Sequence, residues 1–265
     1  MHIDGSARCV ERVRVARQLA ETFDAQVTAL YGVTPSLWRY PMAAEAGAMV
    51  AGELAKLDAE FRDRAKAAFA AASAGSSRMT WAELTNDAPW AFARHALVAD
   101  LMLLGQRDEG DVAAVETAPD FVSSMLVESG RPALLLPYAG PLATIGRNVL
   151  VAWKPTREAA HAVTAALPWL RRAEQVHVIG YGDEADAALQ SLQRYLQAHG
   201  VTAKPHRGGP EPGNAGESLL SEAADRSADL LVMGCYGHSR AREWVLGGAT
   251  RSVLQSMTLP VLMAH

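Results

Sequence analysis

The sequence lacks several features that would narrow its function directly. Only two of its 265 residues are cysteines, Cys9 and Cys235, and they lie far apart without the spacing of a metal site. We interpret both as reduced thiols of a cytoplasmic protein. No apolar run approaches the length of a membrane span, and the N-terminus has no signal-peptide core. The net charge of −4 gives no basic surface, so neither a membrane nor a nucleic acid is an expected partner.

Short metal-ligand and catalytic spacings are also missing. Histidines such as His161, His199 and His206 are dispersed through the second half, and none forms a closely spaced ligand pair. We therefore expect no resident metal. Ser239 beside His238 offers a nucleophile and a base, but no third residue that would orient them is identifiable. Hydrolysis is not favoured, and we do not expect a fast enzyme.

The composition and the apolar pattern indicate the fold class. Hydrophobic residues make up 49% of the chain and charged residues 20%, which suffices for a packed core. Short apolar segments alternate with helical patterns, which predicts an α/β fold with parallel sheets wrapped by helices. Between the second strand and a long helix from Leu54 to Ala72, we expect residues 38–49 to form a loop.

An internal repeat accounts for this alternation. The segment ADLMLLG at 99–105 returns as ADLLVMG at 228–234, and RPALLLP at 131–137 is matched by LPVLMAH at 259–265. Two copies of one βαβα unit explain these matches most simply. The two copies join near residues 138–141, a linker-like stretch.

The repeat predicts two domains, residues 1–139 and residues 145–265. In the second copy, NVLV at 148–151 precedes the position that matches His2, and the first copy lacks this stretch. We therefore expect either a shortened first strand in the first domain or a chain that starts further upstream.

The most informative stretch runs from Gly234 to Thr250. Gly234 follows an apolar run and is expected where a buried strand ends, and Gly237 completes a tight turn with outward-facing amides. A helix with unpartnered first N–H groups is expected to follow, which together with the turn suits phosphate. The same glycines are also compatible with turns and a helix cap alone. The expected helix start comprises Gly247, Gly248, Ala249 and Thr250.

Other residues complete this candidate site. Ala152, Trp153 and Lys154 end the first strand of the second copy, at the same edge of the expected sheet. His238 and Arg240 lie inside the glycine stretch, where a protonated imidazole and a guanidinium can pair with phosphate. Lys154 and Arg240 are also compatible with a solvated charged surface, because exposed Lys is commonplace.

The G-x2-G-x9-G array, the preceding ADLLVMG and the closing PVLMAH resemble the universal stress proteins in their tandem two-domain form. The resemblance covers nearly all of the chain. It implies a five-stranded parallel α/β sandwich in each domain, Rossmann-like and of the nucleotide-binding alpha-hydrolase type, with the fifth strands pairing the two repeats. It also implies that the array holds ATP phosphates and ribose, while an acidic residue after the first strand contacts the nucleoside. Family members without nucleotide exist as well.

The sequence departs from the family pattern in three places. Gly248 stands where the array normally continues with Ser or Thr, and Lys154 replaces the acidic residue after the first strand of the second copy. The first copy keeps Asp4 but has lost the glycine cradle, so we expect its site to be inactive. Acidic residues that would repel a triphosphate follow its fourth strand, namely Asp108, Glu109 and Asp111.

These observations lead to one functional prediction with two alternatives. We expect a stress-response binding or regulatory protein with an ATP site, and thus an adenine-nucleotide partner, in the second domain only. The alternatives are a ligand-free structural scaffold and a slow ATPase or phosphotransfer protein. Pairing of the two apolar closing strands would make one chain a pseudo-dimer, and a further homodimer of chains is left open.

Overall fold

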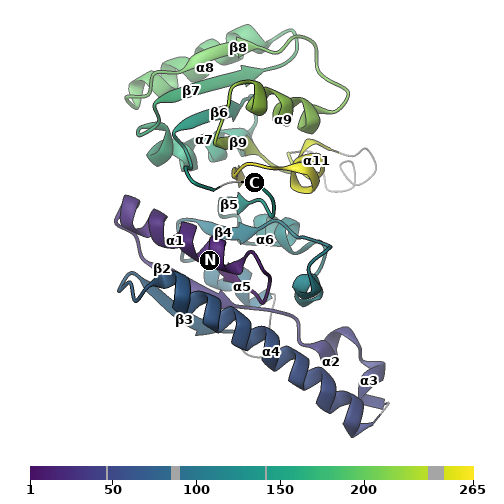
Figure 1. Ribbon diagram of the computed structural model, residues 1–265. Helices are drawn as coiled ribbons and strands as arrows, with labels where there is room; N and C mark the ends of the chain where they lie inside the picture. The colour runs from purple at the N-terminus through teal and green to yellow at the C-terminus, as the bar shows by residue number, and fades with distance from the viewer. Residues whose placement is uncertain (46, 85–89, 141, 238–247) are drawn as a thin grey trace. The chain divides into compact units, whose positions relative to one another are not determined.

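The computed structural model divides the chain into two compact units, Met1–Ser129 and Gly130–His265 (Figure 1). This division differs from the sequence-based boundary between residues 139 and 145, which stays a prediction. The segment 130–137 falls in the second unit because its strand pairs with the closing strand of the chain. The described residues are 1–45, 47–84, 90–140, 142–237 and 248–265.

The first unit is built on a parallel sheet in the strand order β1-β2-β3. A further strand, β4, lies beside β1. Helices α1 and α4 lie side by side (Figure 1). The strands are β1 (His2–Ile3), β2 (Val27–Tyr31), β3 (Met79–Glu83) and β4 (Met102–Gly105). The longer helices are α1 (Cys9–Phe23), α4 (Ala48–Ser73), α5 (Trp90–Ala96) and α6 (Phe121–Ser129), and a 3₁₀ helix, η1 (Val112–Glu116), precedes α6.

The expected loop at residues 38–49 is wrong in part. Two short helices, α2 (Ser36–Arg39) and α3 (Met42–Glu45), occupy much of it, and α4 begins earlier than expected. The carboxylate of Asp58 on α4 accepts hydrogen bonds from the backbone N–H of Ser36 at 2.9 Å and from its hydroxyl at 2.6 Å. Because this anchor is a tertiary contact, local sequence preference does not reveal α2.

The second unit contains a sheet in the strand order β5-β10-β9-β6-β7-β8. Its neighbouring strands are parallel except β5 and β10, which pair antiparallel with Leu134 opposite Leu262. This pairing confirms the prediction that the closing strands of the two repeats join. The strands are β5 (Ala133–Leu136), β6 (Asn148–Ala152), β7 (Gln175–Gly180), β8 (Lys204–Arg207), β9 (Leu230–Gly234) and β10 (Val261–Ala264).

Four described helices flank this sheet. Helix α7 packs on β9 and β10, α8 packs on β7 and β8, and α9 lies beside α11 (Figure 1). Capping residues begin two of them, because Thr156 and Asn214 accept N–H bonds from the first turns of α7 and α9. The helices are α7 (Arg157–Leu170), α8 (Ala185–Ala198), α9 (Ala215–Asp225) and α11 (Ala249–Ser256).

The core of the second unit lies along its central strands. Leu134, Leu150, Leu231 and Leu262 are fully shielded from solvent, as expected for strands covered on both faces. Together with the parallel pairing and the alternating helices, this confirms the predicted α/β fold class. Among the described residues, no helix combines the length and the apolar character that a membrane crossing requires.

Candidate functional site

The strand order of the second unit places a switch point at β6. From β6 the chain continues outward through β7 to β8, whereas β9 and β10 lie on the other side of β6. In open parallel sheets, ligands bind beyond the carboxyl ends of the strands at such a reversal. The segments that leave this edge begin with Trp153 after β6 and Cys235 after β9. The candidate site is therefore built from these two segments.

Glycine is required where β9 ends. A Cβ on Gly234 would lie 2.5 Å from the backbone nitrogen of Ala159, so the strand end packs directly against the start of α7. Tyr236 then adopts a left-handed conformation with φ of 56°. Its N–H donates to the hydroxyl of Thr250 at 3.3 Å, and Thr250 is only 2% exposed. The turn 234–237 is thus tied to the first turn of α11.

Helix α11 begins without a side-chain cap. Gly248 is its N-cap residue, and the helix starts at Ala249. The first backbone N–H groups of a helix have no intrahelical acceptor and carry the positive end of the helix dipole. The end of the turn and the start of α11 therefore form one polar edge of the sheet, with the chemistry of an anion site.

A buried carboxylate lies beneath this turn, and the sequence analysis did not identify it. A Cβ on Gly237 would lie 3.0 Å from Oε2 of Glu158, whose side chain is 7% exposed. Burial acts to raise the pKa of Glu158, but hydrogen bonds from its own N–H and from Arg157 hold it below the usual range. The guanidinium of Arg157 lies 2.9 Å from Oε1. An acid in the first helical turn is common, so no sequence signal marked Glu158.

The other side of the switch point carries the predicted residues that follow β6. Ala152 ends the strand, and the indole of Trp153 donates to the carbonyl of Ala188 at 3.2 Å. The ammonium of Lys154 lies 2.9 Å from Oε1 of Glu211, and both side chains are exposed. Glu211 comes from the loop after β8 and was also missed by the sequence analysis. A Cβ on Gly182, after β7, would contact Glu211 Cγ at 3.5 Å.

The candidate residues therefore divide into two sets. Ala152, Trp153 and Lys154 follow β6, while Gly234, Gly237, Gly248, Ala249 and Thr250 follow β9, all at one edge of the sheet. Their role in binding stays a prediction. Three further predicted residues, His238, Arg240 and Gly247, lie outside the described residues.

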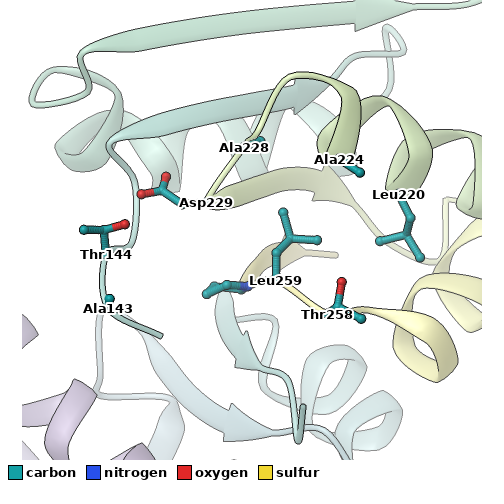
Figure 2. Close-up of a pocket in the computed structure, with 9 residues that line it drawn as sticks. Ala143, Thr144, Leu220, Ala224, Ala228, Asp229, Thr258 and Leu259 are labelled. Atoms are coloured by element: carbon teal, nitrogen blue, oxygen red, sulfur yellow. The ribbon is translucent and has the colours of Figure 1, made fainter. Parts of the chain in front are cut away.

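A cleft lies at the opposite end of the strands from the candidate site. This cleft of about 250 Å³ borders the starts of β9 and β10 and is lined by Thr144, Leu220 and Leu259 among others (Figure 2). The only carboxylate among the residues lining it, Asp229, accepts backbone N–H bonds from residues 146, 147 and 148 at 2.8–3.2 Å. Because this carboxylate already joins the loop before β6 to β9, we assign it a structural role.

No metal centre emerges from the described part of the chain, where no three His, Cys, Asp or Glu side chains gather suitably. Two histidines on neighbouring strands do meet, with Nδ1 of His177 2.9 Å from Nε2 of His206. Burial lowers the pKa of both rings. Two imidazoles are fewer ligands than a structural zinc site has, so we assign no metal to them.

The first unit has a different arrangement after its first strand. Asp4 follows β1 and pairs with Arg12 at 2.7 Å, and the Arg12 side chain is 5% exposed. Burial acts to raise the pKa of Asp4, but Arg12 and His2 hold it below its ordinary value. Of the acids expected to repel a triphosphate, Asp111 instead accepts the backbone N–H of Ala7 at 2.7 Å.

Comparison with known proteins agrees with this architecture. The family model described as the universal stress protein family matches residues 146–265. A universal stress protein of Synechocystis is 44% identical over 50 residues, which are 19% of this chain and 17% of that protein's length. A universal stress protein structure from Archaeoglobus fulgidus, 15% identical, covers 95% of this chain and 90% of its own with a TM-score of 0.66. A Pseudomonas aeruginosa protein of unknown function, 15% identical, covers 94% and 85% with a TM-score of 0.58.

The parallel sheets, the glycine turn at the switch point and the antiparallel closing strands define a tandem Rossmann-like α/β protein. Within that class, the second unit is similar to the universal stress proteins, whose family model matches residues 146–265. The structural matches, all at low identity, support the fold of both units rather than any particular ligand.

Proposed function

We propose that the second unit binds an adenine nucleotide, ATP, at the carboxyl ends of β6 and β9, and that the protein acts in stress-response binding or regulation. The observation that supports this best is the joining of the 234–237 turn to the start of α11 through Tyr236 and Thr250. Backbone N–H groups and a helix N-terminus meet there at the switch point of the sheet.

The residues present fit a phosphate at this edge. A Cβ at Gly237 would press on Glu158, so glycine keeps the turn close to α7 and its backbone accessible. In the proposed complex, the N–H groups at Gly237 and at the start of α11 donate to phosphate oxygens. Lys154 adds a positive charge from the β6 side.

In the proposed complex, two carboxylates near the site change the affinity for phosphate. Glu158 opposes a phosphate on the turn, and the Arg157 guanidinium that contacts it at 2.9 Å offsets this charge. Glu211 holds the Lys154 ammonium, which must exchange that partner for phosphate. Because exposed ion pairs contribute only about 0–1 kcal/mol, a phosphate can compete for Lys154. We therefore propose moderate affinity rather than very tight binding.

Calorimetric titration of ATP into the intact protein tests the proposal. We expect saturable micromolar binding that Gly237→Val abolishes, because the larger side chain would fill the turn. Gly213→Val is the matched control in the same unit, since no atom lies within 4 Å of the Cβ position there. Circular dichroism checks that both variants fold. No binding to the wild-type protein at millimolar ATP, after removal of co-purified nucleotide, would contradict the proposal.

A ligand-free scaffold is the second candidate, and one observation favours it. The positive charge of Lys154, beside the switch point, is already paired with the carboxylate of Glu211. The same titration separates the two functions, and turnover of labelled ATP tests the slow ATPase alternative. The cytoplasmic location and a homodimer of chains stay predictions from the sequence.

A further inference from the structure

The turn between β1 and α1 in the first unit donates its backbone N–H groups to carboxylates of the same unit. The N–H of Gly5 lies 2.6 Å from Oε2 of Glu116, and the N–H of Ala7 lies 2.7 Å from Oδ2 of Asp111. Between them, the N–H of Ser6 donates to Asp4 at 3.1 Å. Three consecutive N–H groups of one turn thus each donate to a different carboxyl group, and two of these acceptors come from the segment after β4.

The side chain of Glu116 is buried against this turn. The residue is 1% exposed, and the Tyr31 hydroxyl at the end of β2 donates to Oε1 at 2.7 Å. A Cβ on Gly5 would lie 2.8 Å from Oε2, so the close approach depends on glycine at this position. Each carboxylate oxygen therefore has its own donor, one from the turn after β1 and one from β2.

The segment that carries both acids is firmly attached. The N–H of Thr34 donates to the carbonyl of Glu116 at 2.9 Å, and Asp111 caps η1 through the N–H of Ala113 at 2.8 Å. The guanidinium of Arg107 donates to the carbonyl of Ala114 at 2.6 Å and also to that of Thr117. The acids are consequently held in place from both ends of η1.

The segment that carries Glu116 and Asp111 matches a segment of the candidate site in the second unit. Residues 106–117 follow β4, and the matching segment of the second unit follows β9 and begins with the glycine turn. In the first unit, the segment after β4 turns acidic side chains onto the N–H groups that follow β1. It therefore occupies the edge that corresponds to the candidate site of the second unit.

We propose that the turn after β1 is a carboxyl-binding site that the chain fills with its own Glu116, while Asp111 accepts the neighbouring N–H of Ala7. The first unit is thus self-liganded, and an external anion reaches this turn only when the Glu116 carboxylate is removed. The proposal concerns the first unit alone and is independent of ATP binding in the second unit.

The electrostatic surroundings favour the neutral form of this seated carboxyl group up to about pH 7. Burial raises the pKa of Glu116 to about 7, against the hydrogen bonds from Tyr31 and Gly5, which act to lower it. Asp4 also acts to raise this pKa and Arg39 to lower it. The charged groups that act on Tyr31, besides Glu116, are Asp58 and Arg62 on α4.

Rescue of a truncated side chain by a small carboxylate tests the proposal. Glu116→Ala removes the internal ligand, and we expect its Tm to rise by about 2–4 °C in excess acetate over equal sodium chloride. Glu109→Ala is the matched control, because Glu109 is an exposed acid of the same segment. We expect no acetate-specific rise in that variant or in the wild-type protein. Equal responses of Glu116→Ala and Glu109→Ala would overturn the proposal.

A second variant covers the case in which Glu116→Ala does not fold. Glu116→Gln keeps the side-chain size and an acceptor oxygen, and the amide signal of Gly5 in a ¹⁵N–¹H spectrum reports directly on the contact. In the wild-type protein, we expect this signal to move with pH as the carboxyl titrates, and in Glu116→Gln to stay constant. Superimposable Gly5 signals in both proteins at every pH would overturn the proposal.

Discussion

The two units differ in the hydrogen bonding of the turn that follows their first strand. In the first unit, the N–H groups of Gly5 and Ala7 donate to Glu116 and Asp111. In the second unit, the corresponding turn begins with Pro155, which has no N–H, and the N–H of Thr156 donates to the carbonyl of Lys154 at 2.7 Å. The turn of the first unit thus has consecutive N–H donors whose acceptors are side chains of the same unit. The turn of the second unit has no such series of donors.

The backbone N–H groups available as donors therefore lie in different segments of the two repeats. In the second unit, candidate donors lie on the β9 side, in the 234–237 turn and at the start of α11. In the first unit, the segment after β4 supplies acceptors instead. A repeat can thus keep its sheet while the segment after its fourth strand changes from hydrogen-bond donor to acceptor. One chain could then combine a closed turn in the first unit with the binding site proposed for the second unit.

The matching glycines at the ends of β4 and β9 should differ most in their tolerance of substitution. A Cβ on Gly234 would lie 2.5 Å from backbone of α7, whereas a Cβ on Gly105 would meet the terminal guanidinium of Arg12. We expect Gly234→Ala to cost about 3 kcal/mol of unfolding free energy and Gly105→Ala about 1 kcal/mol, because a side-chain end can move more readily than a helix. Urea unfolding measures both.

Hydrogen exchange assigns each loss to its unit. Peptides from β9 should exchange faster in Gly234→Ala, and peptides from β4 should change less in Gly105→Ala. Equal losses in the two variants would contradict the contrast between backbone and side-chain neighbours.

The pH dependence of the first unit should follow Glu116. The folded carboxyl keeps its proton up to about pH 7, whereas the unfolded carboxyl releases it near pH 4.5. Between these values the folded state binds more protons, so the contribution of Glu116 to stability falls as the pH rises. The loss is at most about 3 kcal/mol. Glu116→Gln lacks this loss, so its stability relative to wild type should increase from pH 4.5 to pH 7.

Urea unfolding of the two proteins at pH 5 and pH 7.5 measures this difference. The wild-type protein and Glu116→Gln must be compared with each other because His2 also titrates. Burial lowers the pKa of His2 to about 4, so its contribution makes stability rise with pH over part of the same range. That contribution is common to both proteins and cancels. A stability difference that does not change with pH would show that Glu116 does not titrate in this range.

Much of the fold could be predicted because its signals are local and repeated. The match between ADLMLLG and ADLLVMG placed β4 and β9, and the two apolar closing segments indicated the β5–β10 pairing. Helix α2 was missed because its anchor is Asp58, which lies 22 residues further along the chain. A contact of that kind leaves no periodic pattern in the sequence.

The residues after β6 and the glycines after β9 could be predicted for the candidate site, but its carboxylates could not. Gly234 and Gly237 are marked by spacing, whereas Glu116 and Glu158 are acids without any motif, and only burial beside a turn gives them a role. Asp111 was identified as a repelling charge, but its carboxylate accepts the N–H of Ala7. Spacing reveals where the backbone must approach closely, and it does not reveal which side chain fills the space beside it.

Thr250 offers a finer test of the turn in the second unit. Thr250→Val removes the hydroxyl that accepts the N–H of Tyr236 and leaves a side chain of similar volume in a site that is 2% exposed. We expect a loss of about 1 kcal/mol in stability and roughly fivefold weaker ATP binding, because the left-handed Tyr236 loses its tether. Thr202→Val, at an exposed position of the same unit, should change neither quantity. Unchanged ATP affinity in Thr250→Val would mean that the tether does not position the binding groups.

The smallest expected effect concerns the ion pair between Lys154 and Glu211 in the second unit. Both side chains are exposed, at 58% and 65%, so Glu211→Gln should change stability by less than about 1 kcal/mol. It frees the ammonium of Lys154, and we expect ATP to bind about twofold to threefold more tightly at low salt, with the gain lost at high salt. Lys154→Ala should weaken binding and abolish the effect of Glu211→Gln in the double variant. If Glu211→Gln gives the same gain without Lys154, the carboxylate itself repels the ligand, and the second unit then resembles the first more closely than the two turns suggest.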